Sequence, residues 1–318
     1  MSLQLIKPDI NLDFVGKRYF FVALSTAINL AAILLLIFVG LNYGVDFAGG
    51  SVVQLKFDHP TSGDRIRQAL GALDLGEITV QDFGAAGQNQ FLARFQTVKN
   101  IGSLGKRLEG ALNQSYGDSN KAQVLRVETV GAKVGRDLRR DGFLAVAVAT
   151  VFMGIYIALQ FRGVSWSFGA GAVIALIHDV LVVTGALVLS RLINPPGLDF
   201  DLTTLAALLT VIGYSVHDTI IVSDRIREDA AKRRREPLES IMNRAINETL
   251  SRTILTSGTA LTVLLALLLL GGPILRPAAF TLFVGIITGT YSSIYIAGPV
   301  VLFWEGGRRP RNAAARAA

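Results

Sequence analysis

The sequence predicts an α-helical membrane protein in which six transmembrane helices carry one extracytoplasmic α+β domain with the ferredoxin-like order βαββαβ. The 318 residues are 51% hydrophobic and only 17% charged, with a mean hydropathy of +0.47, whereas a soluble domain is about 25% charged. The charges are also uneven, since residues 41–141 hold 13 Lys/Arg and 11 Asp/Glu and the other 217 residues hold 31 charges. This composition excludes a soluble globule and a disordered chain, and it indicates a membrane protein with one soluble module.

Six segments are long and apolar enough to cross the hydrocarbon layer, which takes about 20 residues of helix. They are Tyr19–Gly40, Phe143–Phe161, Phe168–Leu189, Leu202–Ser223, Thr253–Gly272 and Ala278–Phe303. The first is too long for the apolar core of a signal peptide, and no small-residue cleavage site follows it, so we expect a retained anchor over residues 19–40. The other five form a transmembrane region over residues 142–303.

Basic residues gather in alternate short loops. Three precede the first apolar segment, Arg162 lies between the second and third, seven lie between the fourth and fifth, and four follow the sixth, whereas the loops on the other side carry only Arg191 and Arg276. The positive-inside rule therefore predicts that both termini, residues 1–18 and the basic tail 304–318, are cytoplasmic and that residues 41–141 are extracytoplasmic. Because that outer module has a net charge of only +2, the pI of about 9.8 does not indicate nucleic acid binding.

The outer module, residues 41–141, alternates between strand and helix patterns. Apolar and polar residues alternate in four strand-like segments: Ser51–Phe57, Ile78–Gly84, Gln90–Thr97 and Gln123–Val130. Helices are expected over residues 61–72, where Thr61 and Asp64 resemble a capping box, and over residues 101–116, where apolar residues recur at helical spacing. The resulting order βαββαβ is ferredoxin-like. His59, beside Pro60, is interpreted as a plain loop residue, and the module holds no catalytic cluster.

The segment 224–252, between the fourth and fifth apolar segments, is amphipathic and is expected to be cytoplasmic. A helix that starts at Pro237 gathers apolar residues on one face, and we expect this face to lie on the inner membrane surface. The residues on that face are Leu238, Ile241, Met242, Ala245 and Ile246. The basic run Lys232–Glu236 favours a role in orientation and in contact with membrane lipids over the docking of a protein.

Ionisable residues inside the apolar segments are energetically expensive and mark candidate functional sites. Asp218 lies six residues, about 9 Å of helix, inside Asp224 at the cytoplasmic border. Arg252 opens the fifth segment from the same side, with Thr256 one turn later on the same face. One polar pocket holding all three would suit a proton-responsive site, because a positive charge favours the carboxylate and burial favours the neutral acid. A fixed ion pair, with Arg252 partly reaching the lipid headgroups, fits the sequence equally well.

Three further polar residues are candidates for a proton relay. His178 and Asp179 lie near the midpoint of the third segment, and neighbours on a helix point about 100° apart, so we do not expect them to share one partner easily. Each could belong to a relay or hydrogen-bond to Ser or Thr of another helix. His217 titrates near neutrality if unperturbed, but it points away from the side of Asp218. Gly285 and Gly289 form a GxxxG pattern, which predicts close helix packing.

Signatures of enzymes and cofactors are missing from the sequence. The absence of cysteine excludes disulfides and Cys-ligated metals, and the chain contains no P-loop, HExxH, GxSG or GxGD pattern. We therefore predict neither an enzyme nor a bound cofactor or metal. Any work that the protein performs must draw on a gradient or on a partner.

These residues and their spacing resemble the SecF family, whose members are the smaller subunits of the SecDF component of bacterial protein export. The resemblance runs from the first apolar segment to the sixth. Its most specific pieces are Asp46–Ser51 (DFAGGS, with Gly49 and Gly50), the pair His178-Asp179, Gly213–Asp218, Asp224–Glu228 and Asn247–Thr253.

The resemblance implies a fold, partners and a function. SecF-like proteins belong to the RND superfamily, in which six helices form half of a twelve-helix bundle and SecD supplies the other half. The resemblance implies association with the SecYEG channel and a translocating preprotein in the bacterial plasma (inner) membrane, with YajC and YidC as further candidate partners. It also implies that proton motive force assists late stages of translocation.

The family's functional aspartate, arginine and threonine fall on Asp218, Arg252 and Thr256. The sequence departs from the family pattern at His217, where asparagine is expected. Two other functions stay open from the residues: half of an RND-type exporter of small molecules or lipids, and a structural subunit that assembles SecD with the channel without proton coupling.

Overall fold

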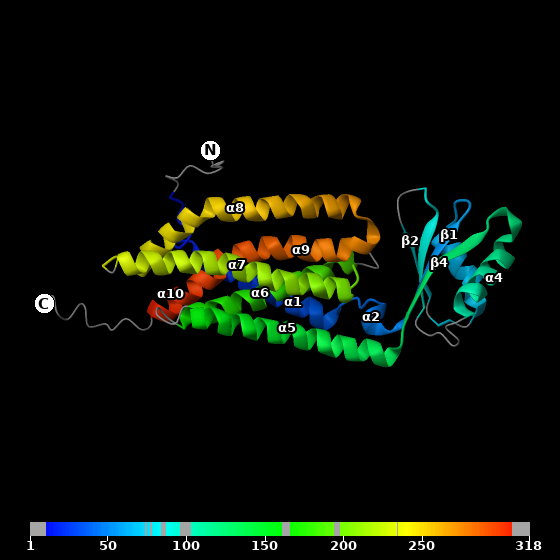
Figure 1. Ribbon diagram of the computed structural model, residues 1–318, viewed down its shortest axis with the longest axis horizontal. Helices are drawn as coiled ribbons and strands as arrows, with labels where there is room; N and C mark the ends of the chain where they lie inside the picture. Colours follow the sequence, from blue (N-terminus) through cyan, green and yellow to red (C-terminus); the bar gives the residue numbers. More distant parts are fainter. Residues whose placement is uncertain are drawn as a thin grey trace.

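The computed structural model describes residues 11–306 except residues 74, 77, 84–86, 96–102, 161–165, 194–197 and 234. These residues form a bundle of long helices with a sheet domain at one end (Figure 1). We call that end of the bundle the domain end and the opposite end the far end. The first ten residues and the predicted basic tail after Gly306 lie outside the described residues.

The described residues contain six helical segments long and apolar enough to span a membrane, which confirms the predicted number. The bundle helices are α1 (Arg18–Phe38), α5 (Ala132–Gln160), α6 (Ser167–Ile193), α7 (Leu202–Lys232), α8 (Leu238–Leu270) and α9 (Gly272–Ser292), with a π-helical turn (Ser293–Ala297) that leads into α10 (Gly298–Gly306). Only 11% of the apolar window of α1 and 17% of that of α8 are buried, against 56% for α6 and α7. Thus α6 and α7 are central, and α1 and α8 present apolar surface outward.

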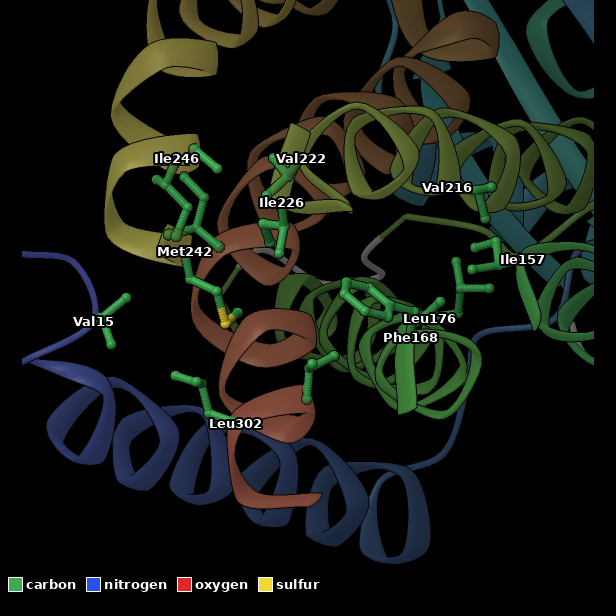
Figure 2. Close-up of a cluster of buried hydrophobic side chains, with 14 of the residues drawn as sticks. Val15, Ile157, Phe168, Leu176, Val216, Val222, Ile226, Met242, Ile246 and Leu302 are labelled. Atoms are coloured by element: carbon green, nitrogen blue, oxygen red, sulfur yellow. The ribbon is translucent and has the colours of Figure 1, made fainter. Parts of the chain in front are cut away.

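The amphipathic segment is not a separate helix on the membrane surface, because α8 runs without a break from Leu238 to Leu270. Its apolar face packs inside the protein: Met242 and Ile246 are 0% and 2% exposed and contact α7 and α10 (Figure 2). The N-terminal segment covers the same place, since the Asn243 side chain accepts a hydrogen bond from the Phe14 backbone N–H at 2.9 Å. The expectation that this face contacts lipid is therefore wrong, because protein buries it.

The sheet domain has the predicted order βαββαβ. It consists of β1 (Gly50–Phe57), α3 (Gly63–Leu70), β2 (Ile78–Phe83), β3 (Gln90–Phe95), α4 (Leu104–Tyr116) and β4 (Ala122–Val130). The strands are antiparallel in the order β2-β3-β1-β4. Alternate residues of β1, such as Val53 and Leu55, are fully buried against α3 and α4, and the other face of the sheet is turned toward the bundle (Figure 1). Ser62, rather than Thr61, caps α3 by accepting a hydrogen bond from the Arg65 backbone N–H.

The sheet domain joins the bundle through a short helix and two glycines. Helix α2 (Val45–Ala48) ends at Gly49, and both Gly49 (φ +77°) and Gly50 (φ +123°) have left-handed backbones. A Cβ atom on Gly49 would lie 2.8 Å from Cα of Ala132, the first residue of α5. Both glycines allow the backbone to turn, and at Gly49 the turn is combined with a close approach that a side chain would prevent.

We predict that Gly49→Ala lowers the free energy of unfolding by at least about 2 kcal/mol, because alanine adds both backbone strain and a contact with Ala132. Gly40→Ala is the matched control, since Gly40 also has a positive φ (+74°) but open space around its Cβ position. It should cost only about 1 kcal/mol of backbone strain. Melting temperatures of the purified variants in detergent check this, and equal losses would contradict a role for the close approach.

A clamp of polar groups holds the sheet domain on the bundle. Arg94 of β3 forms a two-pronged ion pair with Asp199, which precedes α7. Asn42 donates a further hydrogen bond to the same carboxylate at 2.8 Å. Nearby, Phe47 of α2 stacks on Phe200 with 5.6 Å between ring centroids. The domain is thus fixed both by its chain connections and by side-chain contacts with the α6–α7 segment.

Candidate functional site

The centre of the bundle is built on a close approach of α7 and α9. A Cβ atom on Gly285 would lie 2.2 Å from Val211, and one on Gly289 would lie 3.0 Å from Ser215. Larger residues at either position would force the helices apart, as the GxxxG pattern predicts. This packing brings the polar residues of α7 next to Thr290 and Ser292 of α9.

Asp218 is buried in this interface at 2% exposure. Its carboxylate accepts a hydrogen bond from Thr290 at 3.3 Å. Thr290 is 2.7 Å from the Ser257 hydroxyl of α8, which is 3.2 Å from the hydroxyl of Tyr214 on α7. Since each hydroxyl has one hydrogen to donate, Thr290 can donate to Asp218 only if Ser257 donates to Thr290. The result is a chain of hydroxyls that starts at Tyr214 and ends at the buried carboxylate.

Arg252 does not form the predicted direct ion pair with Asp218. The bond between Tyr214 and Ser257 places the antiparallel helices α7 and α8 so that Arg252 lies at about the depth of Asp218. However, Arg252 and Thr256 are exposed on the outer side of α8, and Arg252 acts on Asp218 only through the field of its charge. The depth of Arg252 agrees with the expectation from the sequence, but the rotation of α8 does not. His217 is also exposed, one residue from Asp218.

Asp179 and His178 form a second buried polar cluster. They are 1% and 3% exposed, and His178 Nδ1 lies 2.9 Å from Asp179 Oδ1. The other carboxylate oxygen accepts hydrogen bonds from Ser215 of α7 at 2.6 Å and Ser292 of α9 at 2.8 Å. The neighbours on α6 bond each other, and the two serines bond Asp179 alone, so the pair shares neither serine. The bonds to serines match the packing role that the sequence left open.

The two buried aspartates meet the same α7–α9 interface about one helical turn apart. Asp179 is held through Ser215 and Ser292, and Asp218 is held through Thr290. A change of charge at Asp218 would alter a hydrogen bond between α7 and α9, and one at Asp179 would alter the bonds that join α6 to both of these helices. Because these helices contact each other so closely, such a change acts where the bundle is least able to deform gradually.

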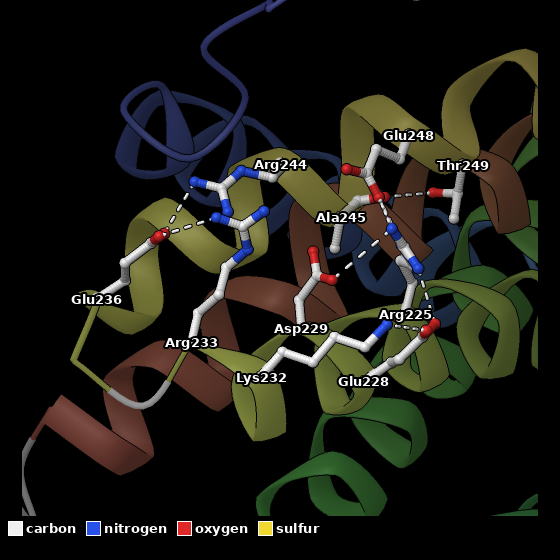
Figure 3. Close-up of polar contacts among 10 residues, drawn as sticks. All are labelled: Arg225, Glu228, Asp229, Lys232, Arg233, Glu236, Arg244, Ala245, Glu248 and Thr249. Carbon is white, nitrogen blue, oxygen red and sulfur yellow. Dashed lines mark hydrogen bonds and ion pairs between the residues drawn. The ribbon is translucent and has the colours of Figure 1, made fainter.

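The far end of the bundle carries a network of ion pairs between α7 and α8 (Figure 3). Arg225 contacts Glu228 and Asp229 on its own helix and Glu248 on α8. In the predicted basic run, Lys232 pairs with Glu228. Glu236 pairs with Arg233 and Arg244, and the hydrogen bonds from Arg244 and then Arg233 hold the pKa of Glu236 below its ordinary value. The network shows that part of this basic run is neutralised within the protein.

At the domain end, three carboxylates surround the start of α7. Asp201 caps the helix by accepting a hydrogen bond from the Thr204 backbone N–H at 2.7 Å, and Asp46 accepts one from the Leu202 N–H at 3.1 Å. Burial raises the pKa of Asp201, and the neighbouring charges of Asp46 and Asp199 add to this effect. Its raised folded-state pKa means that Asp201 adds stability below about pH 4, and that this stability is lost as the pH rises through the folded pKa.

Asp201→Asn should therefore make the protein more stable than the native form at pH 7.5, because asparagine is an equally good helix cap but carries no charge. The gain should disappear at pH 4. Asp199→Asn provides the contrast, since it removes the charged partner of Arg94 and should destabilise the protein at pH 7.5 by about 1.5–3 kcal/mol. Thermal unfolding at the two pH values measures both, and a loss of stability in Asp201→Asn at pH 7.5 would contradict the sign.

Over the described ranges, no group of three or more His, Cys, Asp or Glu side chains is placed to hold a metal ion. The polar residues at the centre of the bundle instead form hydrogen-bonded pairs and chains across helices. Such a site can bind and release a proton and can couple that event to helix packing.

Several residues of the site were given no role from the sequence. Tyr214 and Ser215 fall within the motif Gly213–Asp218, but only as part of the resemblance. Ser257, Thr290 and Ser292, which supply further hydroxyls around the carboxylates, and the clamp residues Arg94 and Asp199 were not singled out. Serine and threonine are common in membrane helices, so their presence alone is a weak signal. For Tyr214 and Ser215 the available signal was their position one turn from Asp218, whereas Ser257, Thr290 and Ser292 lie in apolar segments without an aspartate.

A six-helix membrane bundle with a ferredoxin-like domain after its first helix and buried aspartates on its third and fourth helices is the architecture of one half of an RND-type export protein. Residues 111–307 match the family described as protein export membrane protein SecD/SecF, C-terminal, and residues 34–61 match the SecD/SecF GG motif, which contains Gly49 and Gly50. The chain belongs to the SecF family of protein translocase subunits.

Relatives support this assignment over nearly the full length. Protein translocase subunit SecF of Calditerrivibrio nitroreducens is 41% identical over 96% of this chain and 98% of its own. SecF of Vibrio alginolyticus is 38% identical over 94% of this chain and 91% of its own.

Solved structures of SecDF show the same fold. The crystal structure of SecDF from Thermus thermophilus, described as a translocon-associated membrane protein, has a TM-score of 0.80 and 36% identity over 95% of this chain. A SecDF structure in the super-membrane-facing form has a TM-score of 0.70 over 96% of this chain, also at 36% identity. This chain spans only 40% of the length of either SecDF chain.

Proposed function

We propose that this protein works with SecD as half of a twelve-helix unit and uses proton motive force to assist late stages of protein translocation through the SecYEG channel. The single observation that carries the proposal is Asp218, a buried carboxylate at the end of a hydroxyl chain in a member of the SecF family. Arg252 and Thr256 complete the proposed coupling site, and His178, Asp179 and His217 are candidates for a connected polar relay.

The exposure of α8 supports a partner in the membrane. Arg252 is a charged group on the outer side of a membrane helix, where contact with lipid alone would be costly. A second helix bundle would shield this charge and could supply its counter-charge. The part of the Thermus thermophilus SecDF chain that matches this chain is only 40% of its length, so the larger share lies outside the match. SecD is the partner that fits this requirement.

In the proposed mechanism, a proton from the extracytoplasmic side reaches Asp218 through a polar path formed with SecD. Protonation removes the negative charge that attracts Arg252 at a distance and changes the hydrogen bond from Thr290. Helices α7, α8 and α9 then repack, and the sheet domain, fixed to the start of α7 by Arg94 and Asp199, follows. This motion would help to hold or pull the emerging preprotein on the outer side.

The energy of one proton limits what each step can do. Crossing 100 mV releases about 2.3 kcal/mol per proton, which biases a two-state element by nearly fifty-fold. Inverting a population from 1:99 to 99:1 needs about 5.5 kcal/mol. The proposal therefore requires two nearly balanced arrangements or several proton cycles per exported chain.

The orientation and location belong to the same proposal. The distribution of basic residues supports cytoplasmic termini and an extracytoplasmic sheet domain in the bacterial inner membrane. Membrane lipids would contact the apolar outer sides of α1 and α8. YajC and YidC are further candidate partners.

The test is translocation into vesicles that contain SecYEG and SecD, with or without this protein, in the presence and absence of a proton gradient. The proposal expects this protein to add export that an uncoupler abolishes. A structural subunit would add export that the uncoupler leaves unchanged, and this outcome would overturn proton coupling. Tight binding of a lipid or drug in the bundle with no effect on export would favour the exporter alternative.

A further inference from the structure

A cavity of about 780 Å³ lies between the sheet domain and the domain end of the bundle. One wall is the face of the sheet that α3 and α4 leave open, and the other is formed by the ends of α6, α7 and α9. In Figure 1 the sheet stands across the end of the bundle with α4 on its far side. The volume is within the range of about 300–1,000 Å³ that is typical of ligand sites.

The strand register arranges the sheet wall as two rows of side chains. Gln81, Leu92, Gln54 and Arg126 form one row across the four strands. Arg94, Val52 and Glu128 form the next row across β3, β1 and β4, and all seven residues line the cavity. Each row combines apolar contact with side chains that donate hydrogen bonds.

Two donors on this wall lack acceptors within the part of the chain that the structure describes. They are Nε2 of Gln81 and Nε of Arg94, both shielded from solvent. Buried donors are rarely left without an acceptor, and each such group calls for an explanation. Because both atoms lie beneath the wall surface, a ligand with carbonyl oxygens can accept from them only after the two side chains shift toward the cavity.

Both walls combine acceptors with donors. On the bundle wall Asp46, Asp199 and Asp201 lie with Arg276, and on the sheet wall Glu128 lies with Arg94 and Arg126; Leu189 and Phe280 add apolar packing surface. A ligand that fits between the two walls needs donors and acceptors on both sides, with apolar groups between. The backbone of an extended polypeptide presents N–H and C=O groups on both sides at about 3.3 Å per residue. An acyl chain would shield the charged groups of both walls from water without offering them any hydrogen bond.

We propose that this cavity binds an extended segment of the exported polypeptide between the sheet domain and the bundle. The proposal rests on the proposed function, because the family assignment and the outer location name the polypeptide as the ligand. Recognition is independent of sequence, since side-chain amides, guanidinium groups and carboxylates bind backbone groups. The ion pair between Arg94 and Asp199 keeps the two walls together around the segment.

Cysteine cross-linking in the complete complex tests this. The chain has no natural cysteine, so Gln54→Cys and Leu92→Cys each place one thiol on the sheet wall. Asp118→Cys is the matched control, because the Asp118 side chain is 98% exposed in the same domain and does not line the cavity. Each variant is assembled with cysteine-free SecD and SecYEG, and a translocating substrate with single cysteines at successive positions is arrested and treated with a short bismaleimide.

We expect both cavity thiols to cross-link to a window of a few substrate positions, at least about tenfold more than the control, because a bound segment has an effective concentration in the millimolar range. Equal cross-linking at Asp118→Cys would overturn the proposal, as would cross-linking at neither cavity position while the substrate is shown to be arrested. Lipid that co-purifies in the cavity and blocks both thiols would also overturn it. Uncoupler-sensitive export is measured in the same vesicles, so that failure of the cavity is distinguished from failure of proton coupling.

Discussion

Asp218→Asn should assemble with SecD at native abundance and lose the gradient-dependent part of protein export. Asparagine has the shape of aspartate, and its carbonyl oxygen can still accept the hydrogen bond from Thr290. It cannot bind or release a proton, so the energy of the gradient no longer reaches the bundle. The loss should amount to as much as about fifty-fold at 100 mV if one proton drives each step. Translocation into vesicles at matched protein amounts, with and without a gradient, gives the measurement.

Asp224→Asn is the control for this variant. Asp224 also lies on α7, but its side chain is 55% exposed and pairs with Arg227. Removing its charge changes the net charge of the helix equally and leaves the buried interface intact. It should retain gradient-dependent export. If Asp218→Asn retained export as well, Asp218 would be a structural residue, and the scaffold alternative would replace proton coupling.

The membrane helices and the positions of the strands along the chain could be predicted because each follows from a local pattern. Apolar runs of about 20 residues fix the six membrane segments, and alternation of polar and apolar residues fixes β1 to β4. The close packing of α7 against α9 was also readable, because Gly285 and Gly289 leave no side chain between the helices. In each case the signal lies within one segment and needs no knowledge of its neighbours.

The wrong expectations concern which part of the protein or membrane a side chain contacts. The apolar face that contains Met242 is correct as a pattern, but a pattern does not tell whether lipid or protein covers it, and here α7, α10 and Val15 do. Arg252 lies at the predicted depth, but its direction depends on the rotation of α8, which the hydrogen bond between Tyr214 and Ser257 sets. The clamp between Arg94 and Asp199 joins residues 105 positions apart, and no local pattern connects them.

The second buried aspartate should behave differently from the first. Asp179→Ala removes the acceptor of Ser215 and Ser292 and the partner of His178, all inside the bundle. Breaking a buried charged cluster by removing one partner typically costs about 3–5 kcal/mol. We therefore expect a low melting temperature in detergent and low abundance in the membrane. Asp179→Asn keeps one oxygen acceptor and should lose less stability.

This difference separates a coupling residue from a packing residue. Asp179 bonds to one residue on each of α6, α7 and α9. In contrast, Asp218 accepts one hydrogen bond and lies near the exposed charge of Arg252. Ser215 and Ser292 hold the Asp179 carboxylate in place, and a carboxylate held in this way is poorly suited to a change of partners. If Asp179→Asn proved as stable and abundant as the native protein yet lost gradient-dependent export, Asp179 would instead join Asp218 as a proton-coupling residue.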